Sequence, residues 1–143
     1  SDLIWKQVHQ QAFKSIKEYL VKPPVLMPPK DDKPMKLYIS AADTSIGVLL
    51  AQDNDEKKEH AVFYLSRFLN QTECKYSFLE KLCLALYFAA MKLRYYLLPR
   101  EVFVISGYDL IKYMLSKPIL RNRIGRWILA LSEFSLTYIP QRQ

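Results

Sequence analysis

The side chains that could ligate a metal or act as nucleophiles are few and widely spaced in this sequence. The two cysteines, Cys74 and Cys83, form no C-x-x-C pair, and the two histidines, His9 and His60, are remote from each other. This spacing argues against a zinc site. Cys83 lies inside an apolar run and is predicted to be a small core residue. A lone histidine such as His60 is weak evidence for catalysis.

Basic residues suggest a second kind of chemistry, the binding of phosphate. The chain has 21 lysines and arginines against 14 acids, which gives a net charge of +7. Such a balance draws a protein toward nucleic-acid backbones. One stretch is rich in basic residues and poor in acids, and it contains Lys112, Lys117, Arg121, Arg123 and Arg126. We predict that this stretch contacts phosphates, and the alternative is a solvated helix face.

Aromatic residues near the helix ends allow two interpretations. Tyr95 and Tyr96 could stack on nucleic-acid bases. Tyrosines where a helix ends are more often half-buried, and we predict this for both. Trp127 recurs at helical spacing with apolar neighbours, which favours core packing.

The elements that must position these residues follow from the hydrophobic pattern. Half of the residues are hydrophobic, which is enough for the core of one domain. Residues 3–21 are predicted to form an amphipathic helix that ends before two prolines. After a proline-rich connector, the pattern predicts strands over 36–40, 46–52 and 60–65, a helix over 75–97, a strand over 101–105, helices over 109–115 and 123–134, and a strand over 135–139.

This order predicts an α/β domain, of the mixed α+β kind, with a five-stranded mixed sheet and flanking helices. The helix over 75–97 is apolar on nearly every face and is therefore expected to be buried. The expected domain covers residues 36–143, and residues 1–35 form a leader helix and connector. No apolar run reaches the ~18 residues that a membrane span needs, and no signal peptide opens the chain. We therefore expect a protein that is not secreted and has no membrane partner.

Short motifs stand in a fixed order along nearly the whole chain. Ile46–Gln52 is similar to the strand motif I-G-A-V-L-x-Q, Tyr76–Lys81 to Y-S-x-x-E-K, and Lys112–Pro118 to K-Y-L-L-S-K-P. Further matches stand in the same order at Ala12–Lys14, Pro24–Leu26, Tyr64–Arg67, Leu93–Leu98, Arg126–Trp127 and Leu131–Phe134. Together these motifs resemble the ribonuclease H region of gypsy-type LTR retrotransposon polyproteins, especially those of plants. The resemblance implies a ribonuclease H-like fold within a reverse-transcriptase polyprotein, in the cytoplasm or nucleus.

The resemblance also implies where metal ligands should stand. Enzymes of this family hydrolyse the RNA strand of an RNA–DNA hybrid with two Mg²⁺ ions, which prefer carboxylate ligands. Counted from the matching motifs, the first three acidic positions fall on Ser40, Leu82 and Gly107. The C-terminal helix that carries a fourth acid would lie beyond Gln143. Leucine and glycine offer no side-chain oxygen, so we expect no bound Mg²⁺, no other metal and no catalytic residue.

Nearby acids could still rescue a metal site. Asp43, Glu80 and Asp109 stand two or three residues from the lost positions. On a helix, Glu80 points about 200° away from Leu82, Asp109 is better suited to capping a helix, and Asp43 would reach in only if the strand end bulged.

We therefore expect a catalytically degenerate tether, or connection, domain. It would position an RNA–DNA hybrid or template–primer duplex for the polymerase domains of the same polyprotein. One alternative is an active, Mg²⁺-dependent hybrid ribonuclease that uses the displaced acids. A second is a domesticated protein-interaction module.

Overall fold

The sheet has five strands. A computed structural model describes residues 26–117 and 123–140; the predicted leader helix and Arg121 fall outside the described residues. The strands are β1 (Met35–Ala41), β2 (Ser45–Asp53), β3 (Glu59–Phe68), β4 (Glu101–Ser106) and β5 (Ser135–Pro140). Their order across the sheet is β3-β2-β1-β4-β5. β1 pairs antiparallel with β2, as does β2 with β3, whereas β1–β4 and β4–β5 are parallel. The predicted mixed sheet is confirmed.

The strands alternate between two faces of the sheet. Leu37 and Ile39 of β1 belong to the main core, whereas Tyr38 between them joins a smaller apolar cluster. In β2, Val48 and Leu50 face the main core and Leu49 the smaller cluster. Successive side chains of a strand point to opposite faces, so the apolar run of β2 is buried on both.

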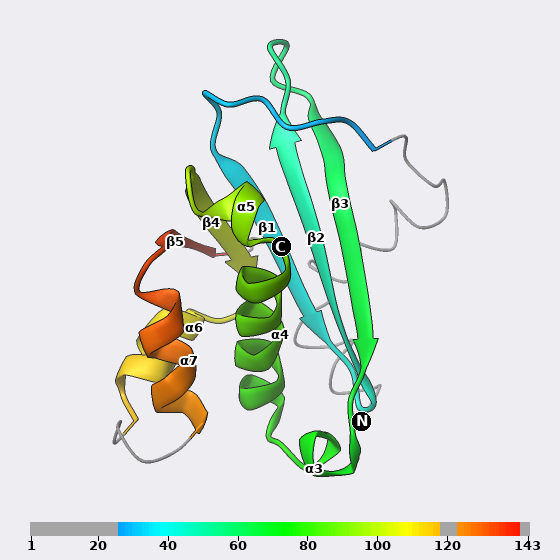
Figure 1. Cartoon of the computed structure of the whole chain (residues 1–143). Helices are drawn as coiled ribbons and strands as arrows, with labels where there is room; N and C mark the ends of the chain where they lie inside the picture. The colour runs from blue at the N-terminus through cyan, green and yellow to red at the C-terminus, as the bar shows by residue number, and fades with distance from the viewer. Residues whose placement is uncertain (1–25, 118–122, 141–143) are drawn as a thin grey trace.

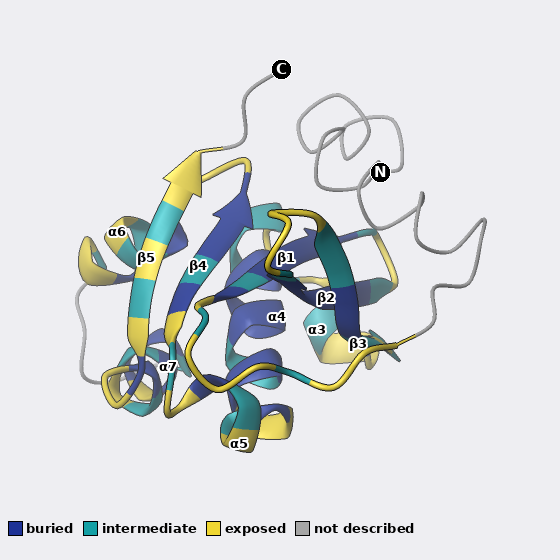
Figure 2. Ribbon diagram, turned by 90° about the horizontal axis from the view of Figure 1, so that it is seen from above, coloured by how far each residue is buried: buried dark blue, intermediate teal, exposed yellow. Residues whose placement is uncertain are grey.

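The helices are α3 (Gln71–Cys74), α4 (Phe78–Lys92), α5 (Arg94–Leu97), α6 (Leu110–Leu115) and α7 (Arg123–Leu131). α4 crosses β1 and β2, and α6 and α7 lie beside it on the same side of the sheet (Figures 1 and 2). Its buried residues include Leu82, Cys83, Leu86 and Ala89, which form the centre of the main core. No helix of the described part of the chain is long and apolar enough to cross a membrane.

The predicted helix over 75–97 is in fact two helices. Ser77 caps α4: its hydroxyl accepts a hydrogen bond from the Glu80 N–H, and the Glu80 carboxylate accepts one from the Ser77 N–H. This capping box satisfies amide groups that a helix start leaves without partners. α4 ends at Leu93, whose φ of −109° and ψ of 23° interrupt the helix before α5. The last predicted helix also ends earlier, at Leu131.

Candidate nucleic-acid site and the family's metal positions

Two parallel strands end side by side at the point where the sequence motifs place two of the family's acidic positions. β1 and β4 are in a parallel register that pairs Tyr38 with Ile105. Extended by two residues, this register is level with Ser40 in β1 and with Gly107, the residue that follows the end of β4. The carboxyl ends of neighbouring parallel strands are a common place for functional side chains.

The side chains at these positions offer little to a cation. Ser40 is 6% exposed, and its hydroxyl donates a 3.4 Å hydrogen bond to the Gly47 carbonyl. A Cβ added at Gly47 would lie 3.1 Å from that hydroxyl, so the hydroxyl is closely packed on its Gly47 side. Leu82 is wholly buried in the main core. With glycine at 107, the three positions present a single neutral hydroxyl.

Each of the three nearby acids makes contacts of its own. Asp43 is exposed in the loop after β1, and its carbonyl accepts a hydrogen bond from the buried Lys81 ammonium at 2.9 Å. Asp109 caps α6, because its carboxylate accepts the Lys112 N–H at 3.0 Å, as the sequence predicted. Glu80 belongs to the capping box of α4. In residues 26–117 and 123–140, no three His, Cys, Asp or Glu side chains gather closely enough to hold a metal.

Glu80 also joins two helices. Its carboxylate forms an ion pair with the Arg123 guanidinium at the start of α7, and that guanidinium lies 4.0 Å from the centre of the Tyr76 ring. Burial alone would raise the pKa of Glu80, but the Ser77 N–H and the Arg123 charge outweigh it and lower that pKa. Arg123 is therefore held in the fold by contacts that join α7 to α4.

The other described basic residues of the cluster are Lys112 in α6, Lys117 after it and Arg126 in α7. The Lys117 ammonium lies 4.7 Å from the centre of the Tyr113 ring. Lys112 and Arg126 are exposed, and neither forms an ion pair with any residue that the structure describes. Of the cluster's described residues, these two are the ones with exposed side chains.

The aromatic residues divide between core and surface. Trp127 is buried between Tyr76 and Tyr87, with ring centres 6.2 and 6.1 Å away, as predicted. Tyr96 is half-buried against Phe63. The same prediction for Tyr95 is wrong, because α5 is a separate turn that leaves this side chain 92% exposed.

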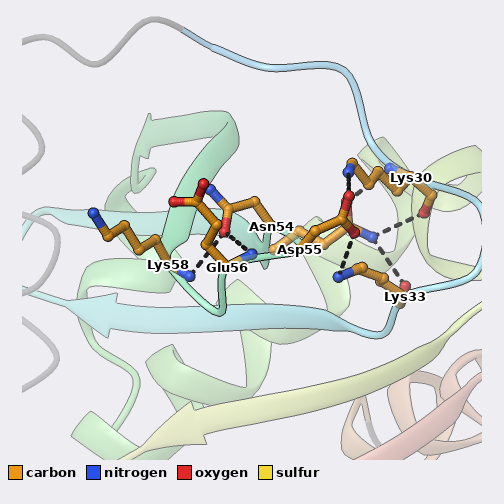
Figure 3. Close-up of polar contacts among 7 residues, drawn as sticks. Lys30, Lys33, Asn54, Asp55, Glu56 and Lys58 are labelled. Carbon is orange, nitrogen blue, oxygen red and sulfur yellow. Dashed lines mark hydrogen bonds and ion pairs between the residues drawn. The ribbon is translucent and has the colours of Figure 1, made fainter.

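The connector before β1 is fastened to the sheet by residues that the sequence analysis did not single out. Gln52 of β2 is 0% exposed. Its amide accepts from the Lys30 N–H at 2.7 Å and donates to the carbonyls of Lys30 and Lys33, each at 2.9 Å. Asp55 in the β2–β3 turn forms ion pairs with both lysines (Figure 3), and these contacts lower its pKa. The sequence did contain a signal for this contact, because a glutamine at the end of an apolar strand is expected to need hydrogen-bond partners.

The sheet order and the helices packed on one of its faces define a ribonuclease H-like fold, and solved structures agree. One is the foamy viral protease-reverse transcriptase in complex with dsDNA, with a TM-score of 0.66 and 18% identity, covering 90% of this chain and 29% of that chain. The same protein in complex with RNA/DNA hybrid gives a TM-score of 0.66 and 19% identity, covering 90% and 18%. The predicted fold is confirmed.

Sequence relatives identify the family. The family described as an RNase H-like domain found in reverse transcriptase matches residues 5–104, and the chain belongs to it. A Tf2-3 transposon polyprotein from Schizosaccharomyces pombe is 32% identical over 142 residues, which are 95% of this chain and 11% of that protein. The Pol polyprotein from transposon 297 of Drosophila melanogaster is 29% identical over 135 residues, 93% of this chain and 12% of that protein. The predicted family is confirmed, and a plant source stays a prediction.

Proposed function

We propose that this domain positions an RNA–DNA hybrid or template–primer duplex for the polymerase part of a retrotransposon polyprotein and does not cut RNA. One observation carries the proposal: Ser40, Leu82 and Gly107 stand where the family's resemblance implies acids. Two Mg²⁺ ions need carboxylate oxygens to balance their charge. A hydrogen-bonded serine, a core leucine and a glycine do not fit them.

Two features support binding without cleavage. The net charge is +7, and Lys112 and Arg126 on neighbouring helices are exposed. Cationic side chains that neutralise phosphates release counterions, so binding of this kind weakens steeply as salt rises. The foamy viral protein that shares the fold was solved in complex with dsDNA and with RNA/DNA hybrid.

The test measures cleavage and binding on the same labelled RNA–DNA hybrid. With Mg²⁺ or Mn²⁺, we expect no cleavage above a protein-free control. In a salt titration, the plot of log K against log salt has a negative slope. Lys112→Ala and Arg126→Ala should each make this slope shallower by about 0.9, because each variant removes about one phosphate contact. Lys58→Ala is the matched control, since this exposed lysine lies in the β2–β3 turn. Its slope should equal that of the unsubstituted chain.

Two results would overturn the proposal in different directions. Cleavage that is abolished by Asp43→Asn would establish an active hybrid nuclease that uses a displaced acid. Absence of any hybrid binding at low salt would favour a protein-interaction module instead.

A further inference from the structure

The connector before β1 is attached to the sheet by polar contacts rather than by apolar packing. We call its described part, residues 26–34, the strap. None of these residues belongs to either apolar cluster of the domain, and Met35, which follows directly, is the first described residue that does. Leu26 is 48% exposed and Met27 47%. Apolar burial is the main driving force of folding, so the strap lacks the contribution that holds the strands and helices together.

The space between the strap and the β2–β3 hairpin is incompletely filled. A cavity of about 530 Å³ opens there, lined by Met27, Pro28, Pro29, Lys30, Asn54 and His60. The Nε2 atom of His60 is buried and has no hydrogen-bond partner among the residues that the structure describes. A buried polar atom without a partner costs free energy, which a water molecule can relieve. The closed strap therefore carries a cost that is removed when the strap leaves the cavity and water reaches the hairpin.

Two ionic contacts tie the strap to the rest of the domain. In the first, the Asp55 carboxylate of the β2–β3 turn pairs with the ammonium groups of Lys30 at 2.9 Å and Lys33 at 3.1 Å (Figure 3). In the second, the Asp31 carboxylate pairs with the Arg100 guanidinium at 3.2 Å. The side chain of Asp55 is 77% exposed and that of Asp31 is fully exposed. Exposed ion pairs are individually weak and are screened by salt. We call these two contacts the ionic latches.

Lys30 links both ionic latches to the hydrogen bonds of the strap. Its ammonium pairs with Asp55, and its carbonyl accepts a hydrogen bond from the Arg100 guanidinium at 3.1 Å. Its N–H donates to the side-chain oxygen of the buried Gln52 at 2.7 Å. Three residues earlier in the strap, the Met27 N–H donates to a carbonyl of β3 at 3.0 Å. Because one residue takes part in both latches, a displacement of the strap at one contact disturbs the others.

We propose that the strap is a conformational unit of its own, which lifts from the sheet as one piece while the five strands and α4 stay folded. Proteins open locally where few apolar contacts hold a segment, at a lower free energy than global unfolding. The two ionic latches set how often the strap opens, so its opening responds to salt. Opening uncovers the outer edge of β3 at Ala61, whose carbonyl the closed strap occupies. The inference concerns this chain alone and does not rest on the proposed function.

Native-state hydrogen exchange of the full chain, followed by NMR, measures this opening. The amides of Met27 and Lys30 report on the strap, because both are hydrogen-bonded across it. The amide of Leu86, which is wholly buried inside α4, reports on the core. We expect the two strap amides to share one opening constant that is larger than that of Leu86. This constant should rise at about 1 M salt, where the Debye length falls to about 3 Å.

Asp55→Asn tests the first latch. This variant breaks two exposed ion pairs, so the opening constant of the strap amides should rise by about fivefold at low salt and change little at high salt. Glu56→Gln is the matched control. It removes the same charge from the same turn, where Glu56 is exposed and forms no ion pair with any residue of the described ranges. Its strap amides should exchange as in the unsubstituted chain.

Asp31→Asn tests whether the strap opens as one piece. This variant breaks the single ion pair of the second latch, so it should raise the opening constant by about twofold. The rise should be the same at Lys30 and at Met27, although Met27 belongs to neither latch. Asp32→Asn is the control, since Asp32 is exposed and forms no ion pair within the part of the chain that the structure describes.

Three results would overturn the inference. An equal opening constant for Met27 and Leu86 would show that the strap leaves only when the whole domain unfolds. An opening constant that does not change with salt would exclude the ionic latches as its control. Faster exchange confined to Lys30 in the Asp31→Asn variant would show that the strap does not open as one piece. No nucleic acid is present in these measurements, so their outcome is separate from that of the proposed function.

Discussion

Replacing Gln52 by glutamate tests whether the buried amide fastens the connector. The two side chains have nearly the same shape, but glutamate cannot donate to the carbonyls of Lys30 and Lys33 as the amide does at 2.9 Å. It can still accept from the Lys30 N–H. Two lost hydrogen bonds cost roughly 2 kcal/mol. A buried carboxylate facing two carbonyl oxygens adds a further penalty, so we expect a loss of about 3–4 kcal/mol at neutral pH.

The stability lost in the Gln52→Glu variant should increase as pH rises. Burial and the carbonyl oxygens raise the pKa of the introduced glutamate above its unfolded value of about 4.3. A raised folded pKa gives stability that is present below the unfolded value and lost as pH rises through the folded one. The variant should therefore be closest to the parent below about pH 4, where a protonated carboxyl can donate one hydrogen bond.

Urea unfolding followed by circular dichroism at several pH values measures both effects. Gln71→Glu is the control, since this exposed glutamine opens α3, and surface changes of this kind stay within about 0.5 kcal/mol. The role of Gln52 in fastening the connector would be refuted if both variants lost the same free energy of unfolding. It would also be refuted if the loss in Gln52→Glu did not grow as pH rises.

Two further predictions concern ionisable groups of α4. Glu80→Gln removes the ion pair with Arg123. The fold lowers the pKa of Glu80, so the stability that this carboxylate contributes is present above its unfolded pKa and is lost as pH falls through its folded pKa. The parent and variant should therefore differ in stability at pH 7 and converge in acid, and parallel melts at pH 7 and pH 3 check this. Burial raises the pKa of the Cys83 thiol to about 12. Iodoacetamide at pH 8 should therefore label Cys74 first and Cys83 only after unfolding. Labelling of both cysteines at equal rates in the folded chain would contradict the buried placement of Cys83.

The strands were predictable because their signals are local. The apolar run of β2 and the alternation in β1 are visible in the sequence, and the observed strands extend the predicted ones by at most a few residues. Neighbouring positions such as Ser40 and Gly107 could be inferred only because the resemblance supplied a fold. Spacing along one chain does not reveal which strands pair.

The errors arise where tertiary packing decides the outcome. Leu93 is compatible with a helix, and nothing nearby in the sequence marks the break that separates α4 from α5. Exposure of Tyr95 follows from that break. α3 was missed, although Asn70 and Glu73 form a capping box that the sequence already contains. The role of Arg123 depends on Glu80, which lies 43 residues away in sequence, so charge counting alone could not assign it.

The burial of Leu82 has an evolutionary consequence. A leucine side chain removed from water contributes about 1.5–3 kcal/mol to stability, and an unpaired carboxylate in its place would forfeit that amount and add a desolvation cost. Under the proposed function, a lineage that carries this leucine therefore meets a stability barrier to a glutamate at position 82, whereas Gly107 is exposed and lies outside the core. Selection for folding alone would then keep the leucine, whether or not RNA cleavage is under selection.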